Sequence, residues 1–304
     1  MNQKTTLVIM AAGLGSRFGG DKQVISVGPS GEMLMEYSIY DAIRAGFNKV
    51  VFILKEAMVE TVRQACGDSI ARFAEVHDAV QDYSDLPSWY QIPAARVKPF
   101  GTVHAVLSAR QYVTEPFAVL NADDYYGYDA FVSMHEALLK LHEGEAAMVA
   151  YRLGNTMSEN GTVTRGVCKC TADGWLESVD ERHNLSYNET HDIRDGDTET
   201  VYSPQEAVSM NFWGFLPSVF DAMQSYFENF LHDLAPENIK GECLLPVMVN
   251  DMLHAKKMQV KVYTTDAVWF GMTYREDYDP ICRKLRELAD KKVYPENLRQ
   301  SQLS

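Results

Sequence analysis

Hydrophobic positions in the first half of the chain alternate between short apolar runs and longer stretches with helical spacing. The apolar runs predict strands at Thr6–Ala11, Lys49–Leu54, Glu75–Gln81, Phe117–Asn121 and Ala147–Tyr151. The stretches between them predict helices at Leu34–Ala45, Ala57–Cys66, Thr102–Tyr112 and Ala130–Leu141. Strands that alternate with helices through short connections indicate an α/β fold, with a mostly parallel sheet flanked by helices.

The pattern changes in the second half, where mixed or antiparallel pairing is expected. Strands are predicted at Gly166–Cys170, Trp175–Glu181, Ala207–Phe215 and Gln259–Thr264, with a polar insert at His183–Pro204. Helices are predicted at Ser218–Phe230, Glu242–His254 and Tyr274–Leu288. We therefore expect a core over 1–235, made of halves 1–127 and 128–235, and a mostly helical extension over 236–304 that packs on it.

The composition and net charge of the chain exclude some classes of binding partner. The 304 residues are 46% apolar and carry a formal net charge of −14, which argues against nucleic acid or an anionic membrane as the main partner. Any anion site must therefore be built locally. No apolar run reaches membrane length, and the first residues are typical of a strand and not of a signal peptide, so a cytoplasmic protein is expected. Five scattered cysteines do not form a disulfide framework, and Cys168 and Cys170 are interpreted as strand residues.

A glycine-rich loop follows the first predicted strand. Residues 13–22 read GLGSRFGGDK and contain four glycines and two cations, Arg17 and Lys22. The loop is not a P-loop, because Asp21 stands where that motif needs lysine, and not a dinucleotide fingerprint, because Phe18 occupies the third glycine position. Exposed backbone N–H groups beside an arginine and a lysine indicate a phosphate site.

A pair of acids follows the strand Phe117–Asn121. Asp123 and Asp124 are oxygen ligands of the kind that magnesium prefers, although two aspartates could also cap the next helix. Sites in parallel sheets form outside the carboxyl ends of the strands, so the glycine loop and the two acids are expected to face one crevice.

AAGLGSR followed by Lys22 resembles the signature loop of the nucleoside-diphosphate-sugar pyrophosphorylases, a sugar-phosphate nucleotidyltransferase family whose pattern is roughly AAGxGTR…PK. The shortened GGDK resembles the version in molybdenum-cofactor guanylyltransferases. The resemblance implies a Rossmann-like, GT-A-like fold, with the nucleotide in 1–127 and the acceptor in 128–235. It implies catalytic roles for Arg17, Lys22 and Asp123. It implies nucleotide contacts from Ala11, Ala12, Gly13, Leu14, Gly15 and Ser16.

The segment Lys98–Ala105 resembles the family's GTxxA motif, which implies that Gly101 and Thr102 contact the nucleobase. Gln81 resembles a glutamine that meets a pyrimidine in this family, and this favours UTP or another pyrimidine nucleotide. His104 is interpreted as an ordinary helix-face residue.

Two motifs of the second half imply acceptor contacts. Glu181-Arg182 resembles the family's EKP segment, and the strand with Asn211 resembles NxGxYxF, which assigns Glu181, Arg182 and Asn211 to the acceptor. Aromatic residues are expected to wall the same site: Tyr125, Tyr126, Trp213 and Trp269.

The resemblance implies magnesium as a cofactor, with Asp123 at the position of the first metal ligand. Trp269–Tyr278 resembles WxDxGTPEDY, in which the second metal ligand is the aspartate; here Gly271 stands at that position. Asp266 and Asp124 are alternative second ligands.

The resulting hypothesis is an enzyme that joins an NTP to a sugar 1-phosphate with release of pyrophosphate. No Ser-His-Asp or Cys-His arrangement competes with this interpretation. Phosphocholine or a similar phosphorylated alcohol is an alternative acceptor. A metal-dependent glycosyltransferase and an inactive nucleotide sensor are alternatives from other classes.

Overall fold

The computed structural model describes residues 3–13, 25–158, 161–188, 190–272 and 274–301. In the first half, the strands are β1 (Thr6–Met10), β2 (Lys49–Leu54), β3 (Glu75–Val80), β4 (Phe117–Asn121), β5 (Asp124–Tyr125) and β6 (Glu145–Arg152). The helices there are α1 (Leu34–Ala45), α2 (Glu56–Val62), α3 (Asp68–Ile70), α4 (Thr102–Ser108) and α5 (Tyr128–Leu138). One-turn helices lie at η2 (Arg63–Gly67), η3 (Arg110–Tyr112) and η4 (Leu153–Thr156).

In the second half, the strands are β7 (Val163–Cys170), β8 (Leu176–Tyr187), β9 (Ile193–Asp195), β10 (Val201–Tyr202), β11 (Ala207–Phe215), β12 (Gln259–Thr265) and β13 (Phe270–Gly271). The helices are α6 (Val219–Asp233), α7 (Leu245–His254) and α8 (Tyr278–Asp290), with short turns at η5 (Arg275–Asp277) and η6 (Leu298–Gln300).

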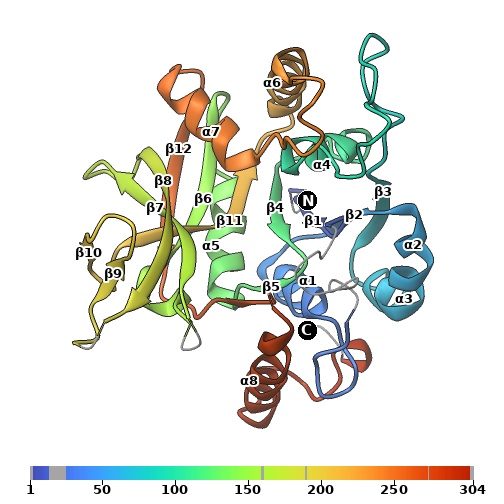
Figure 1. The fold of residues 1–304 in the computed structure, drawn as a ribbon. Coiled ribbons are helices and arrows are strands. Elements are labelled where there is room, and N and C mark those ends of the chain that lie inside the picture. The colour runs from blue at the N-terminus through green and yellow to red at the C-terminus, as the bar shows by residue number, and fades with distance from the viewer. Residues whose placement is uncertain (1–2, 14–24, 159–160, 189, 273, 302–304) are drawn as a thin grey trace.

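A single large sheet runs through the described residues in the order β10-β9-β8-β7-β11-β4-β1-β2-β3, and β6 and β12 join it through β11 (Figure 1). The strands β4, β1, β2 and β3 are all parallel. From β11 onward the pairing is mostly antiparallel, with β12 parallel to β6. The predicted fold class is confirmed: a parallel half with flanking helices, a mixed half, and helices toward the C-terminus.

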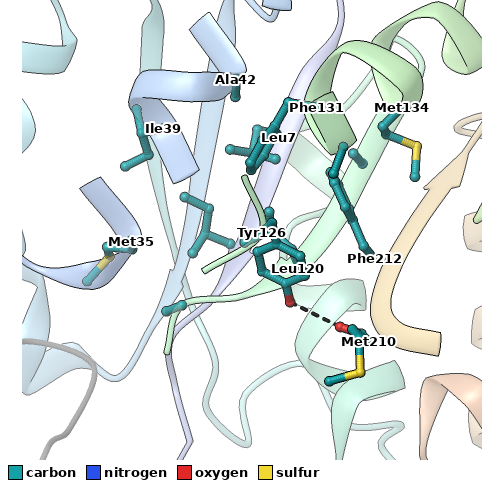
Figure 2. Close-up of a cluster of buried hydrophobic side chains, with 14 of the residues drawn as sticks. Leu7, Met35, Ile39, Ala42, Leu120, Tyr126, Phe131, Met134, Met210 and Phe212 are labelled. Carbon is teal, nitrogen blue, oxygen red and sulfur yellow. Dashed lines mark hydrogen bonds between the residues drawn. The ribbon is translucent and has the colours of Figure 1, made fainter. Parts of the chain in front are cut away.

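Two apolar clusters cover the two faces of this sheet. On one face, α1 and α5 pack over the strands, and Figure 2 shows Ile39, Phe131 and Phe212 in this cluster. On the other face, α4, α6 and α7 bury side chains such as Val103 and Met248. The central strands β1 and β2 are buried along their whole length, as expected for strands with helices on both sides.

The polar insert contains more strand than the sequence predicts. β8 continues to Tyr187, well past the predicted end at Glu181, and β9 and β10 lie inside the insert. The reason is that β8 pairs with both β7 and β9, so its polar residues are held by backbone hydrogen bonds and not by burial. Within the described ranges, no helix combines the length and apolar character needed to cross a bilayer.

A smaller cluster joins α8 and the C-terminal residues to α1, and it contains a buried carboxyl group. The hydroxyl of Tyr294 donates to Asp41 Oδ2 at 2.6 Å and lies 2.9 Å from the hydroxyl of Tyr125. Burial raises the pKa of Asp41 to about 7, against the smaller opposing effects of the Tyr294 hydrogen bond and the Arg44 charge.

This pKa predicts a pH-dependent stability. Asp41 is protonated in the folded chain and ionised in the unfolded chain between about pH 4 and pH 7, so its contribution to stability falls as the pH rises through that window. Asp41→Asn keeps an acceptor for Tyr294 and does not ionise. We expect the variant to gain a few kcal/mol relative to wild type between pH 4.5 and pH 8, measured by denaturant unfolding. The exposed Asp173→Asn is the control, because Asp173 is not among the groups that shift the pKa of Asp41, and an equal difference at both pH values for Asp41→Asn would contradict the prediction.

Candidate active site

The carboxyl ends of β1 and β4 lie side by side and define the centre of the candidate site. Met10 stands opposite Asn121 in the parallel register, and the Ala122 N–H donates to the Met10 carbonyl at 3.1 Å. The chain therefore leaves these neighbouring strands toward Gly13 in one case and Asp123 in the other. The sequence predicts this adjacency from the rule that parallel strands present their carboxyl ends at one edge.

The glycine loop begins at this edge. Ala11 and Ala12 are buried, Ala11 bonds to Ile53 on β2, and Gly13 is exposed. The remaining predicted loop residues lie outside the described residues: Leu14, Gly15, Ser16, Arg17 and Lys22.

A hydrogen-bonded network of polar side chains lies beside the two acids. Asp124 is 8% exposed, and its Oδ2 accepts from the Asn121 amide at 2.9 Å and lies 3.3 Å from the Tyr126 hydroxyl. The Asn211 amide donates to Asn121 Oδ1 at 2.9 Å, and Asn211 Oδ1 accepts from the Trp213 indole at 2.9 Å. Asn211 has φ of 62°, a conformation that asparagine tolerates better than most residues, at an irregularity of β11. The network fixes the Asp124 carboxylate from β4, β5 and β11 together.

Gly271 makes room for the Asp124 carboxylate. The two residues are paired on β13 and β5, and a Cβ added to Gly271 would stand 2.2 Å from Asp124 Oδ1 and 2.8 Å from the Trp269 ring. The carboxylate of Asp124 thus occupies the space that a side chain at position 271 would need. Asp266, the other alternative for a second ligand, is highly exposed and pairs with Arg152 at 3.2 Å.

The donor set fits a magnesium ion. Among the described residues no cluster of three His, Cys, Asp or Glu side chains could hold a metal. Magnesium, however, usually takes one or two protein carboxylates and completes its shell with water and substrate phosphates. Asp123 is half-buried and directly precedes Asp124 in the chain, so this edge of the sheet carries that number of acids.

The predicted base-reading residues meet at the start of α4, although twenty positions separate Gln81 from Gly101. The Gln81 amide nitrogen lies 3.5 Å from the Gly101 carbonyl and 3.4 Å from His104 Nδ1. Gly101 has φ of +95°, and a Cβ there would stand 2.6 Å from the Cys243 carbonyl, so only glycine fits. The Thr102 hydroxyl accepts from the backbone N–H of residue 245, at the start of α7, at 2.7 Å.

His104 lies behind this motif and not in it. The ring is 2% exposed and stacks on Phe227 with centroids 5.0 Å apart. Burial lowers the pKa of His104 to about 4, so the ring is neutral at physiological pH. This placement agrees with an ordinary helix-face histidine.

The predicted acceptor residues lie on β8, across from β7. Glu181 is exposed and stands opposite Gly166, while Arg182 is half-buried and stands opposite Arg165. Arg182 lies 3.7 Å from Asp180. Sequence reasoning missed Arg165. Its signal is a charged residue at an inward position of a strand, since Val163 and Val167 on either side pack into the core.

The expected aromatic wall is wrong for two of its members. Tyr126 and Trp213 are completely buried, because they pack in the apolar clusters on the two faces of the sheet, and their polar atoms bond to Asp124 and Asn211. Tyr125 is 7% exposed and stacks on Phe270 at 4.4 Å, so its contact with an acceptor stays a prediction. Trp269 is half-buried and lies directly beside Gly271.

A parallel α/β sheet with a glycine loop and an acidic motif at adjoining strand ends is the architecture of a nucleotidyltransferase. The family model described as the MobA-like NTP transferase domain matches residues 7–158, half of the chain. The protein belongs to this family, and the resemblance predicted from its motifs is confirmed.

Solved structures of low sequence identity share the fold. An inositol-1-phosphate CTP transferase from T. maritima is 13% identical over 94% of this chain and 97% of that chain, with a TM-score of 0.61. A protein from Bacillus anthracis described as a glucose-1-phosphate thymidylyltransferase, solved with a sucrose, is 14% identical over 93% and 96%, with a TM-score of 0.62. No curated protein matches the sequence.

Proposed function

We propose that the protein transfers a nucleotidyl group from an NTP, with UTP or another pyrimidine nucleotide favoured, to a sugar 1-phosphate. The observation that carries this proposal is the adjacency of Met10 and Asn121, which brings Gly13, the first residue of the glycine loop, and the acidic motif to one edge of the sheet. The two structural neighbours, an inositol-1-phosphate CTP transferase and a described glucose-1-phosphate thymidylyltransferase, support a phosphorylated polyol or sugar as acceptor.

In the proposed reaction, an oxygen of the acceptor phosphate attacks the α-phosphorus of the NTP. The bond from that phosphorus to the β-phosphate oxygen breaks, and pyrophosphate leaves with the bonding electrons. The attacking oxygen is already ionised at neutral pH, so no strong general base is needed. The principal tasks of the site are to align two anions and to neutralise their charge.

Four residues carry the chemistry in this proposal. Arg17 and Lys22 bind the triphosphate and then the leaving pyrophosphate, as the resemblance implies. Asp123 and Asp124 would hold a magnesium ion, which would supply positive charge to the reaction when bound. The hydrogen bonds from Asn121 and Tyr126 keep the Asp124 carboxylate oriented.

A phosphocholine-type acceptor remains the second candidate within the same chemistry. One assay separates these functions: incubation with each NTP, Mg²⁺ and a panel of glucose 1-phosphate, inositol 1-phosphate and phosphocholine, with pyrophosphate as the readout. Release that depends on a sugar or polyol phosphate supports the proposal. Release with phosphocholine alone selects the alternative, and nucleotide binding without any release indicates a sensor. A glycosyltransferase would release nucleotide from a nucleotide sugar and no pyrophosphate.

The base preference gives a specific prediction. Gln81 bonds through its amide nitrogen to Gly101 and His104, which leaves its amide oxygen as an acceptor for a pyrimidine edge. Gln81→Ala is expected to lower kcat/KM for UTP by about tenfold, the value of one hydrogen bond to a base, with less effect on purine nucleotides. Gln64→Ala, which removes an exposed glutamine bonded to Glu60, is the control. Equal losses for UTP and ATP in Gln81→Ala would contradict the assignment.

A further inference from the structure

Arg165 is a half-buried arginine on β7 that the proposed chemistry has not yet used. Its Nε donates to the Thr156 hydroxyl at 3.1 Å, its Nη1 donates to the Thr164 carbonyl at 2.8 Å, and its Nη2 donates to the Thr156 carbonyl. These contacts hold the guanidinium in one orientation and use three of its five N–H donors. Two donors remain for a ligand.

The guanidinium is connected to the Asp124 carboxylate through the Trp269 ring. Its Cζ lies over the Trp269 ring, 4.8 Å from the centroid. The same ring and the Asp124 carboxylate both border Gly271, where an added Cβ would meet Asp124 Oδ1 at 2.2 Å and the ring at 2.8 Å. Arg165, Trp269 and Asp124 therefore form one continuous group of side chains from β7, the segment before β13, and β5.

The charge of Arg165 is not balanced within the described part of the chain. No carboxylate there forms an ion pair with it, and its neighbour across the strand pair is a second arginine, Arg182. Burial lowers the pKa of Arg165 to about 10, and the nearby Asp124 charge opposes this effect, so the group is a cation at neutral pH. Like charges opposite one another in a sheet are unfavourable, and Arg182 has Asp180 3.7 Å away, whereas no such ion pair is found for Arg165 among the described residues.

Two further donors beside Arg165 are buried without a hydrogen-bond partner among the described residues. They are Nε1 of Trp269, the ring on which Arg165 stacks, and Nε of Arg182, its cross-strand neighbour. Buried donors without partners are uncommon, and an unplaced ligand is one explanation for a group of them. An anion bound at Arg165 would balance its charge, and it would give a partner to whichever of these donors faces it.

We propose that Arg165, fixed on Trp269, binds the phosphate group of the acceptor, a phosphate monoester dianion, beside Asp124. The inference rests on the proposed function for the reaction that follows, but it makes its own claim about binding. The acceptor is favoured over the NTP by position, because β7 is separated from β4 by β11 and lies on the far side of the sheet from β2 and β3. A planar guanidinium matches the oxygens of a phosphate through two parallel N–H bonds, which also orients the attacking oxygen.

The competing explanation is that Arg165 only ties η4 to β7. In that case its removal would lower stability and would affect both substrates alike. The two explanations therefore predict different results. A phosphate site predicts loss of affinity for the acceptor alone, and a structural role predicts similar losses for acceptor and nucleotide.

The experiment measures binding directly and activity separately. Isothermal titration calorimetry with glucose 1-phosphate, inositol 1-phosphate and phosphocholine, and with UTP as the other substrate, is carried out in Mg²⁺ on wild type, Arg165→Gln and Arg165→Lys. Arg194→Gln is the matched control, because Arg194 is an exposed arginine on β9 in the same half of the sheet, paired with Glu199. Thermal unfolding of every variant identifies any that fails to fold.

We expect Arg165→Gln to raise the Kd of the preferred phosphate ester by about 10- to 100-fold, the value of a lost charge-assisted pair of hydrogen bonds, while the Kd of UTP changes less than about threefold. Arg165→Lys keeps the charge without the fork and should recover part of the affinity, and it remains informative if Arg165→Gln does not fold. KM values from pyrophosphate release should show the same split.

Several outcomes would overturn the inference. These are equal ester affinity in Arg165→Gln and Arg194→Gln, a parallel loss of ester and UTP binding, and no ester binding by wild type up to millimolar concentration. If the ester binds through Arg165 but no NTP gives pyrophosphate, the proposed function fails and the phosphate site stands. If pyrophosphate is released with an acceptor KM that does not depend on Arg165, the function stands and the site fails.

Discussion

Asp123→Asn is expected to lower kcat by about a thousandfold or more at saturating Mg²⁺, with little change in the unfolding temperature. The carboxylate follows β4 at the edge where β1 also ends, and the amide that replaces it is a poor magnesium ligand. A magnesium ion held by Asp123 would supply positive charge to the reaction, and its loss would raise the barrier by several kcal/mol. Pyrophosphate release under initial-rate conditions gives the comparison.

The exposed Asp85→Asn is the control for the loss of a single acid, and it should retain wild-type turnover. Turnover of Asp123→Asn within tenfold of wild type would remove Asp123 from the site. Asp266→Asn belongs in the same series, because it tests the other sequence-based alternative for the second ligand.

The second large effect is expected when the acid at position 124 on β5 is moved to position 271 on β13. Gly271→Asp alone should lower kcat by about a hundredfold or more, because the new side chain would collide with the Asp124 carboxylate. Asp124→Ala alone should also lose activity. The double variant Asp124→Ala/Gly271→Asp restores one acid in the same space and is expected to recover at least tenfold relative to either single variant.

Metal binding provides a readout of this exchange that does not depend on turnover. Mn²⁺ affinity, measured by electron paramagnetic resonance, should fall in both single variants and recover in the double variant. Gly67→Ala adds a methyl group where the nearest atoms are 3.7 Å away and should leave both measurements unchanged. If the losses of Mn²⁺ affinity add in the double variant, with no recovery, Asp124 is not a metal ligand.

The parallel half of the fold was predictable because local and global signals agree there. β1, β2 and β4 are apolar runs with helices on both sides, so burial alone defines them within a residue or so. β9 and β10 were not predictable, because their exposed polar residues are held by pairing with neighbouring strands. The same reason explains why β8 extends past its predicted end.

The position of the candidate site was also predictable from the sequence, but the surroundings of its side chains were not. The order of the strands predicts that Gly13 and Asp123 leave the sheet at one edge, and β1 and β4 lie side by side there. The environment of an individual side chain depends on distant contacts. Trp213 is buried because it packs with side chains of α4, α6 and α7, and Thr156 and Trp269 orient the Arg165 guanidinium; a local pattern does not reveal these contacts.

The family match ends at residue 158, but residues much later in the chain pack against the candidate site. The Cys243 backbone lies against Gly101, one of the proposed base-contacting residues, and Gly271 leaves space for the side chain of Asp124, a proposed metal ligand. A protein trimmed to the matched region would keep most of the recognisable motifs and lose the surfaces that shape them. Experiments that aim to change the substrate range should therefore vary residues near 243 and 271 as well as the motifs that define the family.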